Sequence, residues 1–365
     1  MLLCLGMTPA TLRLSPEPFG MGAFGAVYHG MLGEESVVAK RAAPNERARY
    51  YWDVEAKINE ALARFAGTPA DRHFAPFLGT FSVEGELHLV WRPSGQESLD
   101  VYLDGERLDE LAHKLSVAEA DLPAELLRQL LAALAHSHAC GIVHRDVKPE
   151  NLLVDAVSGS LVLIDWGSAC EMGSWTWSHT GYEATRTPAS VLYCPPEQLI
   201  DPSAPYAYDL YSAGLIFLRA SVSGLGALEE ALLAMRLQLR DLRHDPDAWL
   251  LRAAAQAPAN ADGSGVDCSL PDGWEAAFGP ALAEPPSAAW ALLRQLVAFE
   301  PSQRISAAEA LVGRYLNADC SVAVGPEIAA PRPWSLEALS AVGRERRHSA
   351  AEECELEQYK SNSLP

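Results

Sequence analysis

The stretch that decides the fold of this chain is Ile142-Val143-His144-Arg145-Asp146-Val147-Lys148-Pro149-Glu150-Asn151-Leu152-Leu153-Val154. Apolar residues flank a polar centre, which predicts a rigid loop held at both ends by buried strands or a helix end. The polar centre carries one carboxylate, one lysine and one amide, at Asp146, Lys148 and Asn151. This set suits phosphoryl transfer, in which the protein mainly positions charged groups.

The same stretch resembles the catalytic loop of protein kinases, His-Arg-Asp-x-Lys-x-x-Asn, and matches it at every fixed position. The resemblance implies that Asp146 orients a substrate hydroxyl and accepts its proton, that Lys148 steadies the γ-phosphate, and that Asn151 binds Mg²⁺. A lysine after the aspartate is typical of the Ser/Thr class. We therefore expect a protein Ser/Thr kinase that uses ATP and Mg²⁺.

The resemblance extends over about residues 16–317 and implies an α+β, bilobal protein-kinase fold. The N-terminal lobe, about 16–92, would be a small β-sheet with one main helix. The C-terminal lobe, about 93–317, would be larger and mostly helical. Residues 1–15 are predicted to be a loose leader, 256–273 a flexible insertion, and 318–365 a disordered tail.

A glycine-rich hairpin is predicted near the N-terminus. Gly20, Gly22 and Gly25 lie between segments with period-two apolar spacing, and Val27 follows them. A strand rather than a helix comes after the glycines, which disfavours a dinucleotide site. The kinase resemblance implies that these four residues cover the nucleotide, and that Lys40, in Val-Ala-Lys, orients its phosphates.

Helical spacing over residues 47–65 predicts the main helix of the N-terminal lobe. Glu55 is the expected partner that holds Lys40 against the α- and β-phosphates. Glu60 is the alternative partner, because either carboxylate could lie on a solvated face of so polar a helix.

Two further strands are predicted at 77–80 and 87–91, which gives an N-terminal sheet of about five strands. Trp91-Arg92-Pro93 is the expected linker between the lobes. The resemblance places Trp91 at the gatekeeper position, where an indole would close the pocket behind the adenine. The alternative is a shift of one residue that puts Trp91 in the core.

The C-terminal lobe begins with an amphipathic helix predicted over 123–140. A buried strand at 161–164 ends in Asp165-Trp166-Gly167, the metal-binding position of kinases with Trp in place of the usual Phe. Asp209-Leu210-Tyr211-Ser212-Ala213-Gly214 matches a core helix of the kinase fold. The resemblance implies that Asp165 holds Mg²⁺ together with Asn151.

Tyr193-Cys194-Pro195-Pro196-Glu197 resembles the end of a kinase activation segment. Seven residues before Glu197 stands Ser190, where Ser/Thr kinases keep a threonine that bonds to the catalytic loop. Arg304 is expected to pair with Glu197 and to lock the lower lobe.

The net charge and the spacing of the cysteines limit the kinds of binding partner and cellular compartment that we expect. The formal net charge of −20 argues against nucleic acid and anionic membrane surfaces, and mildly favours basic protein substrates. The seven cysteines show no CxxC spacing, which favours a reduced compartment over a zinc site. No apolar stretch approaches the ~20 residues that span a bilayer. We expect a monomer.

Finer features resemble plant and algal thylakoid state-transition kinases, notably Phe74-Ala75-Pro76-Phe77-Leu78-Gly79 and Leu89-Val90-Trp91-Arg92. This resemblance implies a chloroplast location and substrates among light-harvesting or photosystem proteins. That family normally carries a transit peptide, a cysteine pair and a membrane helix before the kinase domain, and none is visible here. Either the sequence is truncated at its N-terminus, or the protein is a soluble member of the family with other control, and the cytoplasm is the alternative location.

Two rival functions remain open. One is a catalytically inactive scaffold with a kinase fold, although Lys40, Asp146, Asn151 and Asp165 are all present. The other is a small-molecule kinase, which lacks the Pro-Pro-Glu and Asp-x-Tyr-Ser-x-Gly elements found here.

Overall fold

The structure is a computed structural model that describes residues 11–22, 25–63, 67–68, 70–95, 97–103, 107–172, 192–197, 199–226, 229–255, 270–280 and 286–317. All of these lie within one compact unit, residues 1–328. Ser190, the predicted tail at 318–365 and most of the predicted insertion at 256–273 lie outside the described residues.

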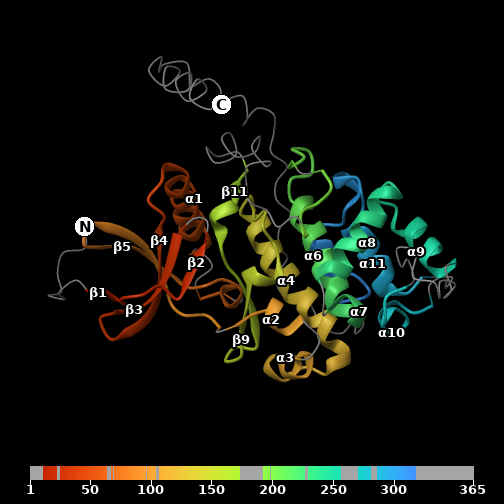
Figure 1. Cartoon of the computed structure of the whole chain (residues 1–365), viewed down its shortest axis with the longest axis horizontal. Helices are drawn as coiled ribbons and strands as arrows, with labels where there is room; N and C mark the ends of the chain where they lie inside the picture. The colour runs from red at the N-terminus through yellow and green to blue at the C-terminus, as the bar shows by residue number, and fades with distance from the viewer. Residues whose placement is uncertain are drawn as a thin grey trace, which may run out of the picture. The chain divides into compact units, whose positions relative to one another are not determined.

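The N-terminal lobe is built on an antiparallel sheet (Figure 1). Among the described residues six strands form it: β1 (Leu12–Leu14), β2 (Gly20–Gly22), β3 (Gly25–Leu32), β4 (Glu35–Ala42), β5 (Phe77–Val83) and β6 (Glu86–Trp91). The strand order is β1-β3-β4-β6-β5, with β2 paired to β3. The prediction of a loose leader is wrong for Leu12–Leu14, because Leu12 is buried and this segment pairs with β3. Three residues are too few to show an alternating pattern, so the pairing partner decides their structure.

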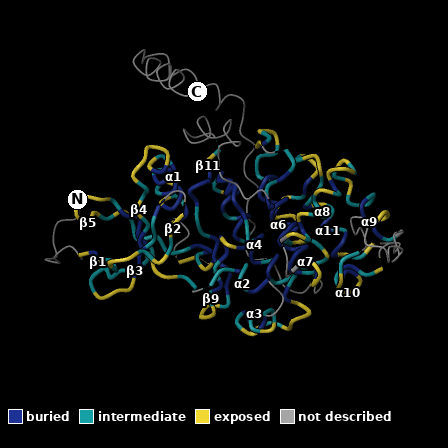
Figure 2. The backbone as a smooth tube through the Cα atoms, in the orientation of Figure 1, coloured by how far each residue is buried: buried dark blue, intermediate teal, exposed yellow. Residues whose placement is uncertain are grey.

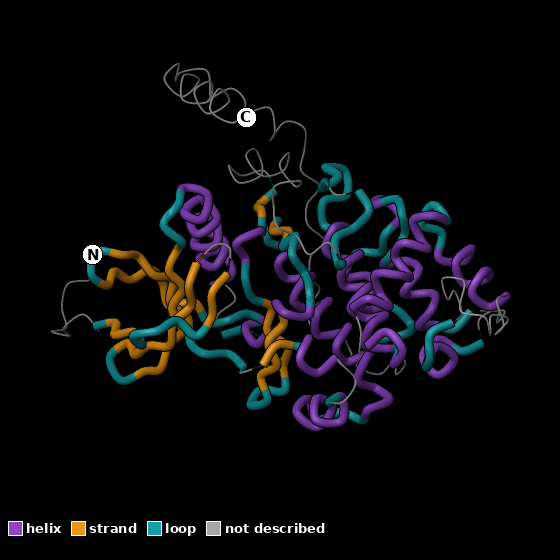
Figure 3. The backbone as a smooth tube through the Cα atoms, in the orientation of Figure 1, coloured by secondary structure: helices purple, strands orange, loops and turns teal. Residues whose placement is uncertain are grey.

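Helix α1 (Glu46–Leu62) lies beside this sheet, as Figure 3 shows. Asn45 caps its first turn, since the Asn45 side chain accepts a hydrogen bond from the Ala48 amide at 2.8 Å. Val54, Ile58 and Leu62 are buried at helical spacing. The helix predicted over 47–65 is therefore confirmed as far as Leu62.

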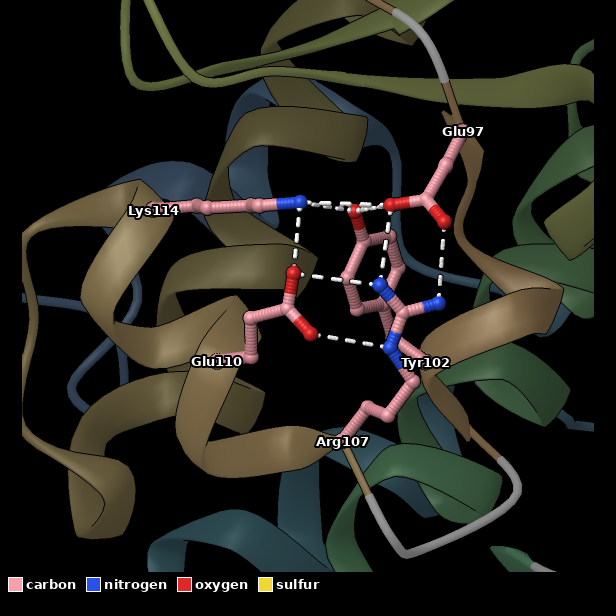
Figure 4. A network of polar contacts seen from close by, with 5 residues as sticks. All are labelled: Glu97, Tyr102, Arg107, Glu110 and Lys114. Carbon is pink, nitrogen blue, oxygen red and sulfur yellow. Dashed lines mark hydrogen bonds and ion pairs between the residues drawn. The ribbon is translucent and has the colours of Figure 1, made fainter.

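The segment after the linker is held by a network of charges (Figure 4). It contains β7 (Glu97–Ser98), α2 (Asp100–Leu103) and α3 (Leu108–Leu115). Arg107 donates to Glu97 at 2.9 Å and to Glu110 at 2.9 Å, and Lys114 donates to the Tyr102 hydroxyl at 2.6 Å. This network joins β7, the strand that follows the linker, to helices α2 and α3.

The central part of the chain contains the long helix α4 (Leu122–Ala139), followed by the short strands β8 (Ile142–Val143), β9 (Leu152–Asp155), β10 (Ser160–Leu163) and β11 (Cys170–Glu171). Strand β9 pairs with β10 and β7, and β8 pairs with β11. Helix α4 ends at Ala139, and two residues later Gly141 has a φ of 79°, the left-handed conformation that glycine adopts without strain. The chain therefore turns sharply from α4 into the loop that opens with β8.

The regular structure in the rest of the described chain is helical and comprises α6 (Ala207–Ser221), α7 (Ser223–Gly226), α8 (Glu229–Asp241), α9 (Pro246–Ala255), α10 (Trp274–Phe278), α11 (Ala288–Leu296) and α12 (Ala307–Val312). Helices α4 and α6 are mostly buried, as Figure 2 shows. Their apolar side chains join one core that also includes Trp290 and Leu293 of α11. The α+β fold class, with a sheet lobe followed by a helical lobe, is confirmed. In the described part of the chain, no helix has the length and apolar character to cross a bilayer.

Candidate active site

The loop between β8 and β9 is anchored to the core by one buried carboxylate. Asp209 of α6 accepts hydrogen bonds from the backbone amides of His144, at 2.8 Å, and Arg145, at 2.9 Å. It also lies 2.9 Å from His138 Nε2 of α4. Burial tends to raise the pKa of Asp209, but the hydrogen bonds from its neighbours hold that pKa below its usual value. The loop is therefore fixed although it has little regular secondary structure.

Asp146, Lys148 and Asn151 meet within this loop. Lys148 Nζ lies 2.9 Å from Asp146 Oδ2. Asn151 Nδ2 donates to the backbone oxygen of Asp146, at 2.8 Å, and to its carboxylate, at 3.1 Å. Because the amide nitrogen of Asn151 is bonded to Asp146, its carboxamide oxygen is the atom that suits a cation. The structure therefore brings together the three polar residues that the sequence motif predicts to act together.

Lys40 of β4 bridges two carboxylates from distant parts of the chain. Its ammonium lies 2.7 Å from Glu55 Oε2 of α1 and 2.9 Å from Asp165 Oδ1, which follows β10. Glu60, the alternative partner, is exposed, whereas Glu55 is buried. The structure thus brings together Lys40, Glu55 and Asp165.

The charges in this cluster shift one another's pKa values. Burial alone would lower the pKa of Lys40, but Asp165 and Glu55 hold that pKa above its ordinary value. Burial raises the pKa of Glu55 to about 7, although Lys40 opposes the change. Burial also acts to raise the pKa of Asp165, yet Lys40 outweighs it and the net pKa lies below the usual range. Asp165 is therefore an anion at neutral pH.

Backbone geometry aims Asp165 at this cluster. Asp165 has φ 60° and ψ 68°, a left-handed conformation that is uncommon for residues other than glycine. Trp166 is buried beside it, and the centroid of its ring lies 4.5 Å from the ring centroid of His144 and 6.0 Å from that of Phe74. A strained residue held by well-packed neighbours is typical of functional sites.

A cavity of about 780 Å³ collects these groups. Its lining includes Lys40, Glu55, Asn151 and Asp165, and the remaining residues that line it are Phe19, Gly20, Val27, His29, Val38, Asn59, Ala75, Trp91, Arg92, Pro93, Ser94, Gly95, Leu153, Ile164 and Trp166. Such a size and mixed lining fit a small-molecule ligand.

The glycine-rich hairpin forms one wall of the cavity. Gly20 of β2 pairs with Val27 of β3, and Gly22 pairs with Gly25, so these glycines lie on the two paired strands of the hairpin. Gly20 and Val27 line the cavity directly. Glycine backbones can approach phosphates without a side-chain clash.

Trp91 lies on the cavity wall, at the end of β6. Its indole N–H donates to Asn59 Oδ1 of α1 at 2.9 Å, and its ring lies 5.5 Å from that of Phe77. This position agrees with the gatekeeper interpretation and not with a place in the core away from the cavity. Sequence reasoning missed Asn59, whose signal was its place one helical turn after Glu55.

Asn151 and Asp165 form a donor set that fits Mg²⁺. They supply an amide oxygen and an ionised carboxylate at one cavity, and Mg²⁺ commonly binds through one or two such groups together with waters and phosphates. Across the described ranges, no three or more His, Cys, Asp or Glu side chains form a cluster that could hold a metal alone.

Arg304 and Glu197 form the pair expected from the sequence. The guanidinium of Arg304 contacts both carboxylate oxygens of Glu197, at 2.6 and 2.8 Å, and donates to the Ala207 carbonyl at 3.0 Å. Ser212 donates to the carbonyl of Tyr193 at 2.9 Å. The segment 192–197 is therefore fixed to the helical lobe.

The cavity is lined by the paired Lys40, by the glycine-rich hairpin and by Asn151 of the loop that also carries Asp146 and Lys148. In an α+β fold with a sheet lobe and a helical lobe, this arrangement is that of the kinase class of protein. The family model described as the protein kinase domain matches residues 15–316. This chain belongs to the protein kinase domain family.

Two plant proteins are similar to most of the chain. Serine/threonine-protein kinase STN7, chloroplastic, of Arabidopsis thaliana is 29% identical over 337 residues, which cover 82% of this chain and 56% of that protein. Serine/threonine-protein kinase STN8, chloroplastic, of the same plant is 26% identical over 330 residues, which cover 72% of this chain and 64% of that protein. The chain thus spans less than two thirds of the length of each relative.

One solved structure has the same fold. It is the crystal structure of a Stt7 homologue from Micromonas algae soaked with ATP, with a TM-score of 0.66 and 24% sequence identity. The match covers 88% of this chain and 95% of that one.

Proposed function

We propose that this protein is a serine/threonine protein kinase that transfers the γ-phosphate of ATP to Ser or Thr of protein substrates. The observation that carries the proposal is the meeting of Lys40, Glu55 and Asp165 with Asn151 at one cavity, beside Asp146. Membership of the protein kinase domain family supports it.

The nucleotide would lie between the glycine-rich hairpin and the linker. Gly20, Gly22, Gly25 and Val27 cover it from the hairpin side, where backbone amides can donate to phosphate oxygens. Lys40, kept charged by its two carboxylates, orients the α- and β-phosphates. Glu55 fixes the position of that ammonium.

Asp165 and Asn151 would hold Mg²⁺, which neutralises charge on the β- and γ-phosphates when it is bound. Asp146 orients the incoming hydroxyl and takes its proton, and Lys148, whose ammonium lies 2.9 Å from Asp146, steadies the γ-phosphate. Ser190 is proposed to support Asp146 from the activation segment.

Substitution of single residues separates binding from chemistry. Asp165→Asn is expected to weaken binding of Mg-ATP and to abolish transfer, because the metal ligand is lost. Asp146→Asn should leave nucleotide affinity near the parent value while turnover falls by ~10²-fold or more, the usual scale for loss of a general base. Lys40→Met should stop transfer. The measurements are radiolabel transfer to a generic basic protein and a nucleotide-binding titration of each variant.

Glu60→Gln is the matched control for Glu55→Gln, since both residues lie on α1 and only Glu55 contacts Lys40. Glu55→Gln should lower turnover and Glu60→Gln should not. If the parent binds Mg-ATP but labels no protein, and Asp146→Asn changes nothing, the chain is an inactive scaffold.

The substrates are proposed to be chloroplast proteins, among them light-harvesting or photosystem proteins. The support is the similarity to STN7 and STN8, both named as chloroplastic. The chain is proposed to act as a monomer in the chloroplast. A fluorescent fusion to the complete native transcript should mark the chloroplast, and purely cytosolic fluorescence would contradict this location.

A further inference from the structure

Helix α1 is tied to the sheet on both sides of Glu55. Three residues before Glu55, the indole N–H of Trp52 donates to the backbone oxygen of Lys40 at 3.2 Å. Four residues after Glu55, Asn59 Oδ1 accepts the indole N–H of Trp91 at 2.9 Å. The first hydrogen bond reaches the strand that carries Lys40, and the second reaches the strand that ends at the linker.

Asn59 uses both ends of its carboxamide. Its oxygen binds Trp91, and its nitrogen donates to the backbone oxygen of Glu55 at 2.8 Å. Only 4% of Asn59 is exposed. Burial of an amide costs free energy unless the amide is hydrogen-bonded, so the two hydrogen bonds hold this side chain in one orientation. An aliphatic side chain at the same position would pack without any hydrogen bond.

The two bonded residues lie on the wall of the nucleotide cavity. Asn59 and Trp91 line it together with Lys40, Glu55 and the linker residue Arg92. A shift of α1 away from the sheet would break the Asn59–Trp91 bond and the Glu55–Lys40 ion pair at once, because Asn59 and Glu55 are one turn apart on the same helix.

We propose that Asn59 and Trp91 are positioning residues. Their hydrogen bond ties α1 to β6, the strand that ends at the linker, and thereby maintains the ion pair between Glu55 and Lys40. The inference rests on the proposed kinase function, in which the Lys40–Glu55 pair orients the phosphates. Neither Asn59 nor Trp91 touches the reacting atoms. They act on the rate through Glu55.

A double-mutant cycle tests the tether. Asn59→Leu keeps most of the volume and removes the acceptor, and Trp91→Phe keeps an aromatic ring and removes the donor. Each single variant should lower kcat about five-fold, the rate equivalent of one ordinary hydrogen bond, with little change in KM for the protein substrate. The double variant should be no slower than the slower single variant, because both changes remove the same bond.

A second measurement needs no catalysis. Amide hydrogen exchange over residues 54–62 should be faster in Asn59→Leu and in Trp91→Phe than in the parent, and Glu60→Gln, on the exposed side of the same helix, should exchange like the parent. If the parent shows no transfer to protein, the proposed function fails and this exchange measurement alone decides the tether.

For an active parent, either of two results would overturn the proposal. One is parent-like kcat in both single variants. The other is a double variant whose kcat falls by the product of the two single effects, about 25-fold, because independent packing defects multiply whereas the loss of one shared bond does not. For an inactive parent, unchanged exchange over residues 54–62 in both variants would overturn it.

Discussion

His73 shows how a single buried residue makes stability depend on pH. It is 2% exposed, and its Nδ1 lies 3.2 Å from the carbonyl oxygen of Leu161. Burial, reinforced by the positive charges of Arg72 and Arg128, lowers the pKa of His73 to about 4, although the hydrogen bond to Leu161 opposes the change. The folded protein therefore keeps this imidazole neutral.

Because the pKa of His73 is lower in the folded chain than the ordinary 6.5, the unfolded chain takes up the proton first as the pH falls. The free energy of unfolding should be at its full value above about pH 6.5 and should decrease towards pH 4. Between pH 7 and pH 5 this one group should account for about 2 kcal/mol. Urea unfolding of the parent and of His73→Gln, which cannot titrate, should show a loss smaller by that amount in the variant. Equal losses in both proteins would mean that His73 is not the group responsible.

At the scale of single residues, chemistry and spacing predicted much of the candidate site. The sequence motifs predict Lys40, Glu55, Asn151 and Asp165 as site residues, and all of these line one cavity. Asn59 was not picked, because an asparagine on a helix has many possible roles and only the fold brings the indole of Trp91 to it. Ser190 lies outside the described residues, and its role remains a proposal.

At the scale of elements, two glycines in the hairpin of β2 and β3 have different surroundings and therefore different roles. A Cβ on Gly25 would lie 2.0 Å from the backbone oxygen of Arg41, whereas a Cβ on Gly22 would meet no atom within 4 Å. Gly25 thus permits the close packing of β3 on β4. Gly22 is free of such contacts and fits a role towards the nucleotide.

Gly25→Ala should therefore lower the free energy of unfolding by about 1–3 kcal/mol, because β3 and β4 must move apart. Gly22→Ala, its matched partner, should leave the unfolding midpoint near the parent value and should weaken binding of Mg-ATP, since the added methyl group would stand between the backbone and the phosphates. Thermal unfolding without nucleotide, followed by a nucleotide titration, checks both. A large drop in Tm for Gly22→Ala would contradict this assignment.

Elements with a long periodic pattern were the ones predicted well. Helices α1 and α4 were expected from apolar spacing, and their observed ends differ from the predicted ones by three residues or fewer. Strand β1 was missed, because its three residues owe their structure to pairing with β3 and not to a pattern of their own. The remaining sheet order depends on long-range pairing that a local pattern does not encode.

At the scale of the whole molecule, the Arg304–Glu197 pair joins two segments that lie far apart in the sequence. The side chain of Arg304 is fully buried, and that of Glu197 is 17% exposed. Arg304→Ala should lower the free energy of unfolding by about 3–5 kcal/mol, because it leaves a carboxylate and several carbonyl groups without their partner. Urea unfolding measures the change.

A surface ion pair gives the matched comparison. Arg294 lies 2.5 Å from Asp247, with both side chains about 40% exposed. Arg294→Ala should cost no more than about 1 kcal/mol, because solvent screens an exposed pair. Similar losses for Arg294→Ala and Arg304→Ala would show that burial does not set the strength of the Arg304 pair.

The position of Arg304 near the end of the described chain also has a consequence for biosynthesis. Lys40, Glu55, Asp146 and Asp165 all leave the ribosome before it, whereas the segment around Glu197 waits for Arg304 to be made. At roughly 5–20 residues per second, the delay between Asp165 and Arg304 is on the order of ten seconds. During translation the proposed nucleotide-binding residues are thus synthesised before the residue that fixes segment 192–197 to the helical lobe. A nascent chain would therefore contain the proposed nucleotide-binding residues for some seconds before the partner of Glu197 has been made.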